Sequence, residues 1–255
     1  MCALFQSKVR PSAPLAVEPA PALFPAMTGA ELAADFLGTR IAGDLYDSLR
    51  VSPERVLFGL LDVAGRREDN GALLDAAQNI FRTFGAELFS GPDINESDSM
   101  TELSLRINRT LLETSHGVHP CPAFIGCYHE KFGTLCYSNA GHTPGLLRDP
   151  SGVTELGSTG LPLGLFSHVT AEAPTVAIEK GAALLLVSRG LVECEGGPKR
   201  STEEFGMDRV KELFRAAPIA SAQGLSAFVL NSVRDFGAAA LQCEDRTALA
   251  LVRTA

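Results

Sequence analysis

The sequence lacks a long hydrophobic run, a basic leader and a surplus of positive charge. No window of about eighteen residues is apolar and uncharged, so we predict no membrane-spanning helix. No basic stretch near the first residue is followed by a long apolar one, so we expect no signal peptide and a cytoplasmic location. With 30 acidic residues against 22 Lys and Arg, the net charge is −8, which argues against a nucleic-acid-binding surface.

The sequence also lacks two short motifs, one built on cysteine and one on serine. The six cysteines include no Cys-x-x-Cys pair, so we expect reduced thiols in the core. There is no Gly-x-Ser-x-Gly motif, which leaves Ser–His–Asp catalysis without its nucleophile. A zinc site stays open as an alternative in the segment that holds His116, His119, Cys121, Cys127 and His129, although this spacing is not typical of structural zinc.

The composition and the apolar pattern predict one sizeable globular unit. Hydrophobic residues make up 45% of the 255 residues, enough for a large core. Residues 1–27 are rich in Pro and Ala without periodicity, so we expect an extended lead-in, and we assign residues 28–255 to the domain proper.

Within the domain, strand-like and helix-like segments come in blocks. Apolar runs over 41–51 and 55–63 flank a short turn and predict a hairpin. Helical spacing follows over 68–89 and 100–114, the second helix capped by Ser97 or Ser99. Further strands, two more helices and a last strand complete the chain. This order predicts an α+β fold: two packed antiparallel β-sheets flanked by α-helices.

Several carboxylates end or interrupt the apolar runs. Asp44 lies in "IAGDLYD", Asp62 ends "VLFGLLD", and Glu244 and Asp245 precede "RTALALV". Burying a lone carboxylate is costly, so these groups need a cation, amide donors or water. Hard divalent ions such as Mg²⁺ or Mn²⁺ bind such oxygens. The other interpretation is that they are turn and edge residues in water.

The order of short motifs resembles one known family. "GDLYD", "LDVAG", "NAGHTPGLL", "GLPLGLF", "LLLVSRGLVEC" and "EDRTALALV" follow one another as in the PPM-type (type 2C) metal-dependent protein phosphatases, most of all the bacterial SpoIIE-like branch. The resemblance implies two packed antiparallel sheets flanked by helices. It also implies two Mn²⁺ or Mg²⁺ ions that bridge a water, which attacks a phosphoserine or phosphothreonine.

The resemblance also implies roles for single residues. Asp62 would bridge both ions, and the Val63 carbonyl would bind the first ion with Asp44 nearby. Glu244 would bind the second ion, together with Asp62 and the acidic residue of a Thr-Asp-Gly motif. This chain has Ser188-Arg189-Gly190 at that motif. A guanidinium stays positively charged and does not bind a metal.

These departures predict altered chemistry. We expect Arg189 to replace the second ion and to pair with Asp62 and Glu244. Arg66 and Arg67 replace two residues of the family's Gly-His-Gly, so Arg66, Arg67 and Arg189 form a candidate phosphate-binding set. The chain is then predicted to act on or bind a phosphorylated regulatory protein, such as an anti-sigma-factor antagonist, with one ion or none and with catalysis weak or lost.

Three alternatives stay open at this point. The chain could be an active phosphatase with a rearranged ligand set that includes Glu193, Asp47 or Glu244. Arg189 could be a surface residue on a rearranged loop, since long charged side chains usually reach solvent. His142 in "NAGHTPG" could act as an acid or base, but we expect it to shape a turn.

Overall fold

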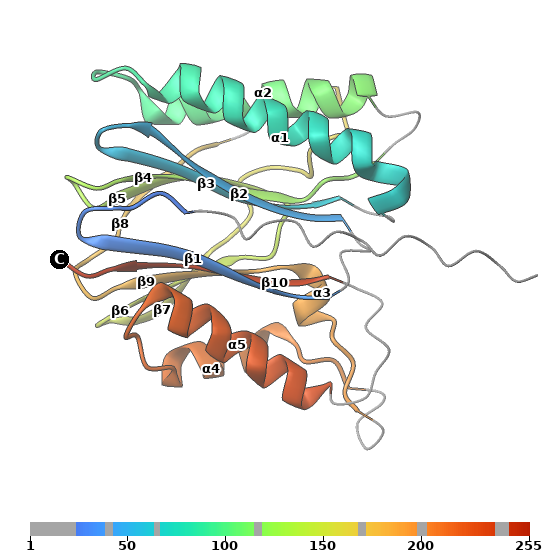
Figure 1. Cartoon of the computed structure of the whole chain (residues 1–255), viewed down its shortest axis with the longest axis vertical. Helices are drawn as coiled ribbons and strands as arrows, with labels where there is room; N and C mark the ends of the chain where they lie inside the picture. Colours follow the sequence, from blue (N-terminus) through green and yellow to red (C-terminus); the bar gives the residue numbers. More distant parts are fainter. Residues whose placement is uncertain are drawn as a thin grey trace, which may run out of the picture.

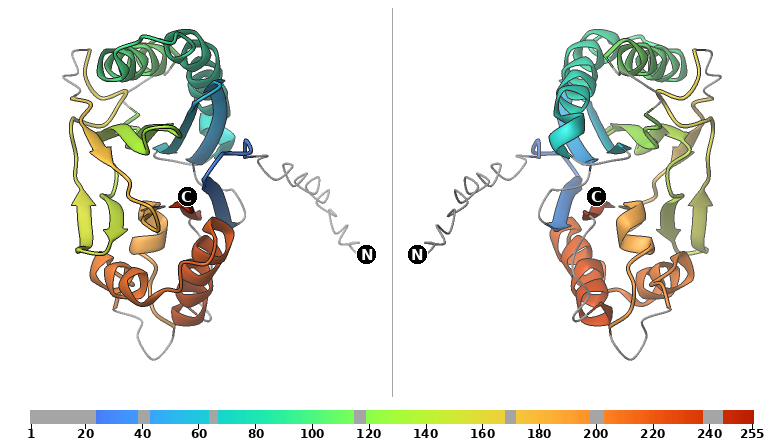
Figure 2. Two further views of the ribbon diagram at one scale, coloured as in Figure 1. Left: turned by 90° about the vertical axis from the view of Figure 1, so that its left-hand side faces the viewer. Right: turned by 90° about the vertical axis from the view of Figure 1, so that its right-hand side faces the viewer.

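Two antiparallel sheets lie face to face, and helices cover both outer faces (Figure 1). The computed structural model describes residues 24–38, 43–63, 67–114, 119–167, 172–197, 203–237 and 245–255. Side views show the long helices at the two far ends of the stack and the sheets between them (Figure 2). The predicted fold class is confirmed.

Each sheet has five strands. The first sheet has the order β2 (Gly43–Ser52), β3 (Arg55–Val63), β4 (Ala123–His129), β5 (Thr134–Ala140), β8 (Thr175–Ala177). The second has the order β1 (Ala30–Leu37), β10 (Arg246–Arg253), β9 (Ala183–Val187), β6 (Gly145–Asp149), β7 (Gly152–Leu156). The helices are α1 (Arg67–Phe89) and α2 (Glu96–Thr114) on the first sheet, the short α3 (Arg189–Val192) after β9, and α4 (Met207–Ala216) and α5 (Ala222–Phe236) on the second sheet.

Strand β3 shows how the sequence builds both sides of the first sheet. All nine of its residues are buried. Val56, Phe58 and Leu60 belong to the core between the sheets. Leu57, Leu61 and Val63 belong to the core under α1 and α2. Because side chains alternate along a strand, Asp62 continues the row that faces the other sheet.

The same alternation brings polar residues of both sheets to one end of this inner core. The inward rows comprise Tyr46 of β2, Leu184 and Leu186 of β9, and Leu249 and Leu251 of β10. Two residues further along each row lie Asp44, Ser188 and Thr247. The apolar interior between the sheets therefore ends in polar side chains at this edge.

Asp47 lies on the opposite face of β2 and ties the strand to α1. Its carboxylate accepts hydrogen bonds from Arg82 Nε at 2.6 Å and from Gln78 Nε2 at 2.9 Å. Arg82 Nη2 donates to the second oxygen at 2.7 Å, so the arginine contact is bidentate. Asp47 is therefore a structural anchor and turns away from the inner core.

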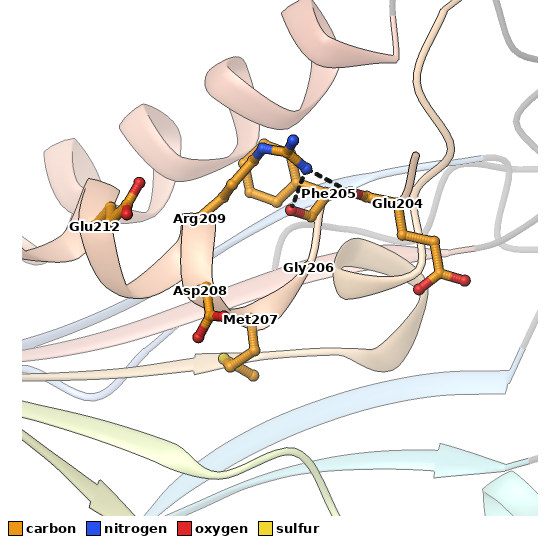
Figure 3. Close-up of a pocket in the computed structure, with 7 residues that line it drawn as sticks. All are labelled: Glu204, Phe205, Gly206, Met207, Asp208, Arg209 and Glu212. Carbon is orange, nitrogen blue, oxygen red and sulfur yellow. Dashed lines mark hydrogen bonds between the residues drawn. The ribbon is translucent and has the colours of Figure 1, made fainter. Parts of the chain in front are cut away.

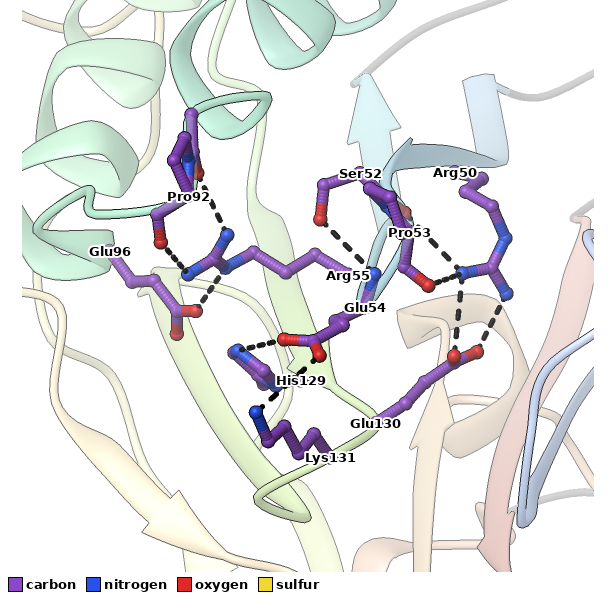
Figure 4. A network of polar contacts seen from close by, with 11 residues as sticks. Arg50, Ser52, Pro53, Glu54, Arg55, Pro92, Glu96, His129, Glu130 and Lys131 are labelled. Atoms are coloured by element: carbon purple, nitrogen blue, oxygen red, sulfur yellow. Dashed lines mark hydrogen bonds and ion pairs between the residues drawn. The ribbon is translucent and has the colours of Figure 1, made fainter.

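A second polar network closes the far end of the first sheet (Figure 4). Arg55 at the start of β3 bonds Glu96 at 2.6 Å and donates to the carbonyl of Gly91 at 3.0 Å. The side chains of Arg55 and Glu96 are only 8% and 15% exposed. Arg55 thus fixes the β2–β3 hairpin against the turn between α1 and α2.

We predict that Arg55→Met lowers the free energy of unfolding by about 3 kcal/mol, because it leaves the mostly buried Glu96 carboxylate without its partner. Urea denaturation measures the change. The control is Arg106→Met: its pair with Glu102 is equally short, at 2.6 Å, but the side chains are 30% and 44% exposed. That control should lose less than about 1 kcal/mol. Equal losses in the two variants would contradict the assignment.

The structure corrects two sequence expectations. The cap of α2 is Asn95, whose Oδ1 accepts the amides of Ser97 at 3.1 Å and Asp98 at 3.4 Å, so the prediction of Ser97 or Ser99 is wrong. The strand β1 was not predicted. The predicted hairpin is present as β2 and β3, with strand-like structure beginning at Gly43 in the described residues.

The remaining general expectations concern cysteines, membranes and the lead-in. Four cysteines fall in the described ranges, and all four are buried: Cys121, Cys127, Cys136 and Cys194. None of the described helices has both the length and the apolarity needed to cross a bilayer. Of the predicted lead-in, residues 1–23 lie outside the described residues. Phe24 stacks on Tyr46 with ring centroids 6.3 Å apart, so the end of this segment packs on the domain.

Candidate functional site

Two buried carboxylates face each other at the edge of the inner core. Asp44 and Asp62 are direct partners in the antiparallel pairing of β2 and β3. Each is 8% exposed. Side chains of directly opposed residues lie close together, and like charges there repel. The pair therefore needs a cation, a shared proton or strong donors.

Hydrogen bonds from the second sheet hold Asp44. Thr247 Oγ1 of β10 donates to Asp44 Oδ2 at 2.7 Å. Burial, together with the neighbouring Asp62, raises the pKa of Asp44 from 3.8 to about 8, while hydrogen bonds from Thr247 and Ser188 act in the opposite direction. Without a bound cation, Asp44 is therefore mostly protonated at neutral pH.

A glycine is required beside this pair. Gly43 is the partner of Val63, and a Cβ atom at position 43 would lie 2.0 Å from the Val63 carbonyl oxygen. Such a contact is impossible for any other residue type without moving the strand. The glycine of "GDLYD" thus lets β2 and β3 approach closely where the carboxylates begin.

Arg189 approaches the carboxylate pair from the second sheet. It is the first residue of α3, directly after the buried Ser188. Its Nε lies 3.7 Å from Asp62 Oδ2 and 3.9 Å from Glu193 Oε2. The side chain is 57% exposed. Arg189 therefore caps the pair from the solvent side, and its second described partner is Glu193.

The raised pKa of Asp44 predicts how the stability of the cation-free protein depends on pH. The folded chain holds a proton on Asp44 up to about pH 8, whereas the unfolded chain releases it near the usual value of 3.8. The folded state thus binds more protons between these values, so cation-free protein loses stability as pH rises from about 4 to about 8. Relative to Asp44→Asn, the wild-type melting temperature should fall over this range.

Cation binding should reverse this protonation. A carboxylate must lose its proton to bind a metal, so Mn²⁺ binding at pH 7 should release about one proton from Asp44. Calorimetry in buffers of different ionisation enthalpy measures the release. The Asp44→Asn variant should release none from this position, and a wild type whose binding heat is independent of the buffer would contradict the assignment.

Other predicted site residues are placed only in part. Glu244 and Arg66 lie outside the described residues, so their predicted roles stay predictions. Arg67 is the first residue of α1, and its side chain also lies outside the description. Val63 ends β3 and is buried. Of the alternative ligands, Asp47 is bound by Arg82 on the other face of the sheet.

His142 lies in the loop between β5 and β6 and is buried. Its amide donates to Asn139 Oδ1 at 2.8 Å, and its ring Nδ1 lies 3.2 Å from the Thr143 carbonyl oxygen. Burial lowers the pKa of His142 to about 4, so the ring is neutral at physiological pH. These contacts agree with a role in shaping the turn.

The zinc alternative finds no support in the described part of the segment. Cys121 and Cys127 are buried in the core under α1 and α2. The His129 ring instead contacts the Phe132 ring in a tilted arrangement, with centroids 4.4 Å apart. Its Nε2 lies 3.7 Å from Glu54 Oε2 (Figure 4). Within the described ranges no three His, Cys, Asp or Glu side chains gather as a metal site, and His116 lies outside them.

A pocket at the start of α4 lies apart from the carboxylates (Figure 3). It is lined by Glu204, Phe205, Gly206, Met207, Asp208, Arg209 and Glu212. Arg209 Nη1 donates to the carbonyls of Glu204 at 2.6 Å and Phe205 at 3.0 Å. Its guanidinium therefore holds the loop in place, and the pocket contains none of the predicted site residues.

The donor chemistry at the carboxylate pair fits a divalent cation. Two carboxylates on opposed strands supply the hard oxygen ligands that Mg²⁺ and Mn²⁺ prefer. Burial and the repulsion from Asp62 raise the pKa of Asp44, and a bound cation would offset both effects. The cationic Arg189 lies against Asp62 on the exposed side.

Ser188 and Thr247 lie within the quoted motifs, but the motif analysis assigned them no role in the site. Both are fully buried and neither ionises, so neither stood out among charged residues. A signal was nevertheless present. Each is two residues from an inward-facing leucine, Leu186 and Leu249, and a hydroxyl at such a position indicates a polar partner inside.

Comparison with known proteins identifies the family of this chain. The model of the family "Stage II sporulation protein E (SpoIIE)" matches residues 52–255. Phosphoserine phosphatase RsbP of Bacillus subtilis (strain 168) is 23% identical over 156 residues, which are 61% of this chain and 38% of RsbP. The chain thus spans well under half of that relative.

Solved structures share the fold. The RsbU and RsbW domains of Rv1364c from Mycobacterium tuberculosis match with a TM-score of 0.72 and 23% identity, over 94% of this chain and 64% of that one. The PP2C phosphatase domain with a regulatory-domain fragment of SpoIIE from Bacillus subtilis matches with a TM-score of 0.66 and 16% identity, over 88% and 64%. Because the family model covers well over half of the sequence, the chain belongs to the SpoIIE family of PP2C-type phosphatase domains.

Proposed function

We propose that this chain binds, or slowly dephosphorylates, a phosphoserine- or phosphothreonine-bearing regulatory protein, with Arg189 in place of the second metal ion. Catalysis is then weak or lost. The proposal rests on one observation above all. Arg189 Nε lies 3.7 Å from Asp62 Oδ2, where the family resemblance expects a metal-binding carboxylate.

In this proposal, some residues of the chain bind the metal ion and others bind the phosphate. Asp44, Asp62 and the Val63 carbonyl would hold one Mn²⁺ or Mg²⁺. When bound, such an ion supplies an activated water and neutralises charge on the phosphoryl group. Arg189 binds phosphate oxygens through its fork of N–H donors, joined by Arg66 and Arg67. Glu244 adds a further carboxylate.

A second candidate is an active Mn²⁺- or Mg²⁺-dependent serine/threonine phosphatase with a rearranged ligand set. Its support is the exposure of Arg189. At 57% exposed and with contacts of 3.7 and 3.9 Å, longer than hydrogen bonds, the side chain has room to swing away from Asp62. Glu193, which lies beside Arg189, is then available as a ligand.

The partner class follows from the family and from charge. RsbP is named a phosphoserine phosphatase, and we propose a phosphoserine substrate for this chain as well. A phosphorylated regulator such as an anti-sigma-factor antagonist is the kind of protein that the resemblance implies. A net charge of −8 makes local arginines the main attraction for a phosphate.

Phosphopeptide binding in the absence of metal tests this proposal. With EDTA present, we expect wild type to bind a fluorescent phosphoserine peptide about 10-fold more tightly than Arg189→Gln does, because one charge-assisted hydrogen bond is lost. Fluorescence anisotropy measures both affinities, and the unphosphorylated peptide is the control. Equal affinity of the two proteins for the phosphopeptide would contradict a phosphate-binding role of Arg189.

A further inference from the structure

The Thr247 hydroxyl spans the two sheets at the carboxylate pair. Thr247 belongs to β10 of the second sheet, and Asp44 belongs to β2 of the first. Thr247 Oγ1 donates to Asp44 Oδ2 at 2.7 Å, inside a fully buried environment on the threonine side. This bond therefore links the orientation of a carboxylate on one sheet to the backbone of the other.

Two hydrogen bonds with Ser188 hold the backbone of Thr247 in place. Its amide donates to Ser188 Oγ at 3.0 Å, and its carbonyl accepts from the Ser188 amide, also at 3.0 Å. The Ser188 Oγ also lies 3.4 Å from the Asp245 carbonyl oxygen. A β-branched side chain has restricted rotamers, so a fixed backbone also fixes the direction of its hydroxyl.

A third hydroxyl fixes the strand end next to Ser188. Thr143 Oγ1, from the loop after β5, donates to the carbonyl of Val187, the last residue of β9. Val187, Ser188 and Arg189 are consecutive. Ser188 thus bonds Thr247, which holds Asp44, and directly precedes Arg189, which contacts Asp62.

We propose that Thr247 is a positioning residue: its hydroxyl holds Asp44 in the orientation in which this carboxylate, together with Asp62, would bind a divalent cation. This inference rests on the proposed function, since the cation is part of that proposal. A residue that forms a hydrogen bond with a metal ligand fixes the orientation of that ligand, and its mutation typically lowers metal affinity by about 10- to 100-fold. Thr247 acts through Asp44 and is not itself a ligand.

Mn²⁺ affinity is the direct test. We expect Thr247→Val, which keeps the shape but removes the hydroxyl, to bind Mn²⁺ about 10-fold or more weakly than wild type by calorimetry. Thr247→Ser, which keeps the hydroxyl, should stay within about 3-fold of wild type. The matched control is Ser226→Ala. It removes a buried hydroxyl that donates to Asp35 at 2.6 Å on the α5 side of the second sheet, and it should leave Mn²⁺ affinity unchanged.

A measurement without metal separates positioning from general destabilisation. Thr247→Val should lower the melting temperature in the wild-type background and lower it much less in an Asp44→Ala background, because the bond is already absent there. An equal loss in both backgrounds would overturn the inference.

The two failures are distinguishable. Suppose that wild type and Arg189→Asp both bind Mn²⁺, and that adding Thr247→Val to either protein leaves its Mn²⁺ affinity unchanged. The inference about Thr247 then fails while the cation site stands. If neither wild type nor Arg189→Asp binds Mn²⁺, the cation site of the proposed function fails, and the role of Thr247 in orienting a ligand fails with it.

Discussion

The Arg189→Asp variant should hydrolyse a phosphoserine peptide in Mn²⁺ about 100-fold faster than wild type. The substitution removes a cation that lies against Asp62 and supplies a carboxylate at the same place. At about 4 Å and an effective dielectric constant near 20, one charge repels a dication by roughly 8 kcal/mol. Only about 2.7 kcal/mol of this needs to appear in the barrier for a 100-fold change.

Two controls separate ligand gain from loss of charge. Arg189→Gln removes the guanidinium without supplying a ligand, so its rate should stay well below that of Arg189→Asp. Arg234→Asp makes the same charge change at a residue of α5 that is 58% exposed, close to the 57% of Arg189, and it should leave the rate unchanged. Initial rates of phosphate release measure all four proteins. A wild type as fast as Arg189→Asp would show that the ligand set is rearranged and would favour the second candidate function.

The Asp62→Asn variant should lose Mn²⁺ binding by about 100-fold or more, along with any activity that wild type has. Asp62 is the carboxylate that opposes Asp44 and contacts Arg189, so the proposed ion and the arginine both depend on its charge. An amide keeps the shape of the side chain but is a much poorer ligand for a hard dication. Calorimetric titration with Mn²⁺ measures the affinity.

The matched control is Asp47→Asn on the neighbouring strand β2. Asp47 is as buried as Asp62, with 4% against 8% of its surface exposed, but it faces α1 and binds Arg82. This variant should unfold at lower urea concentration and keep its Mn²⁺ affinity. If Asp62→Asn bound Mn²⁺ as tightly as wild type, the carboxylate pair would not be the cation site.

The fold was largely predictable because apolar alternation is a direct consequence of burial between layers. In β3 both faces are covered, so the run from Arg55 to Val63 is continuous, and the turn before it marked the hairpin. Strand β1 could not be recognised in the same way. Its sequence AELAADFL is rich in residues that favour helices, and its strand form depends on pairing with the distant β10.

The candidate site was predictable where charge drew attention to it and hidden where it did not. The opposition of Asp44 and Asp62 follows from the hairpin register once the turn is known. The contact between Arg189 and Asp62 joins two sheets, so no local pattern could give it, and it came from the family resemblance. Thr247 and Ser188 are neutral and buried, and their role emerges only when the two sheets are stacked.

The number of Mn²⁺ ions bound per chain tests the central claim most directly. Equilibrium dialysis followed by elemental analysis counts the ions in wild type and in Arg189→Asp side by side. If Arg189 occupies the second-metal position, wild type binds at most one ion and the variant binds one more than wild type. Two ions in wild type, with no gain in the variant, would contradict the claim and place Arg189 outside the metal site.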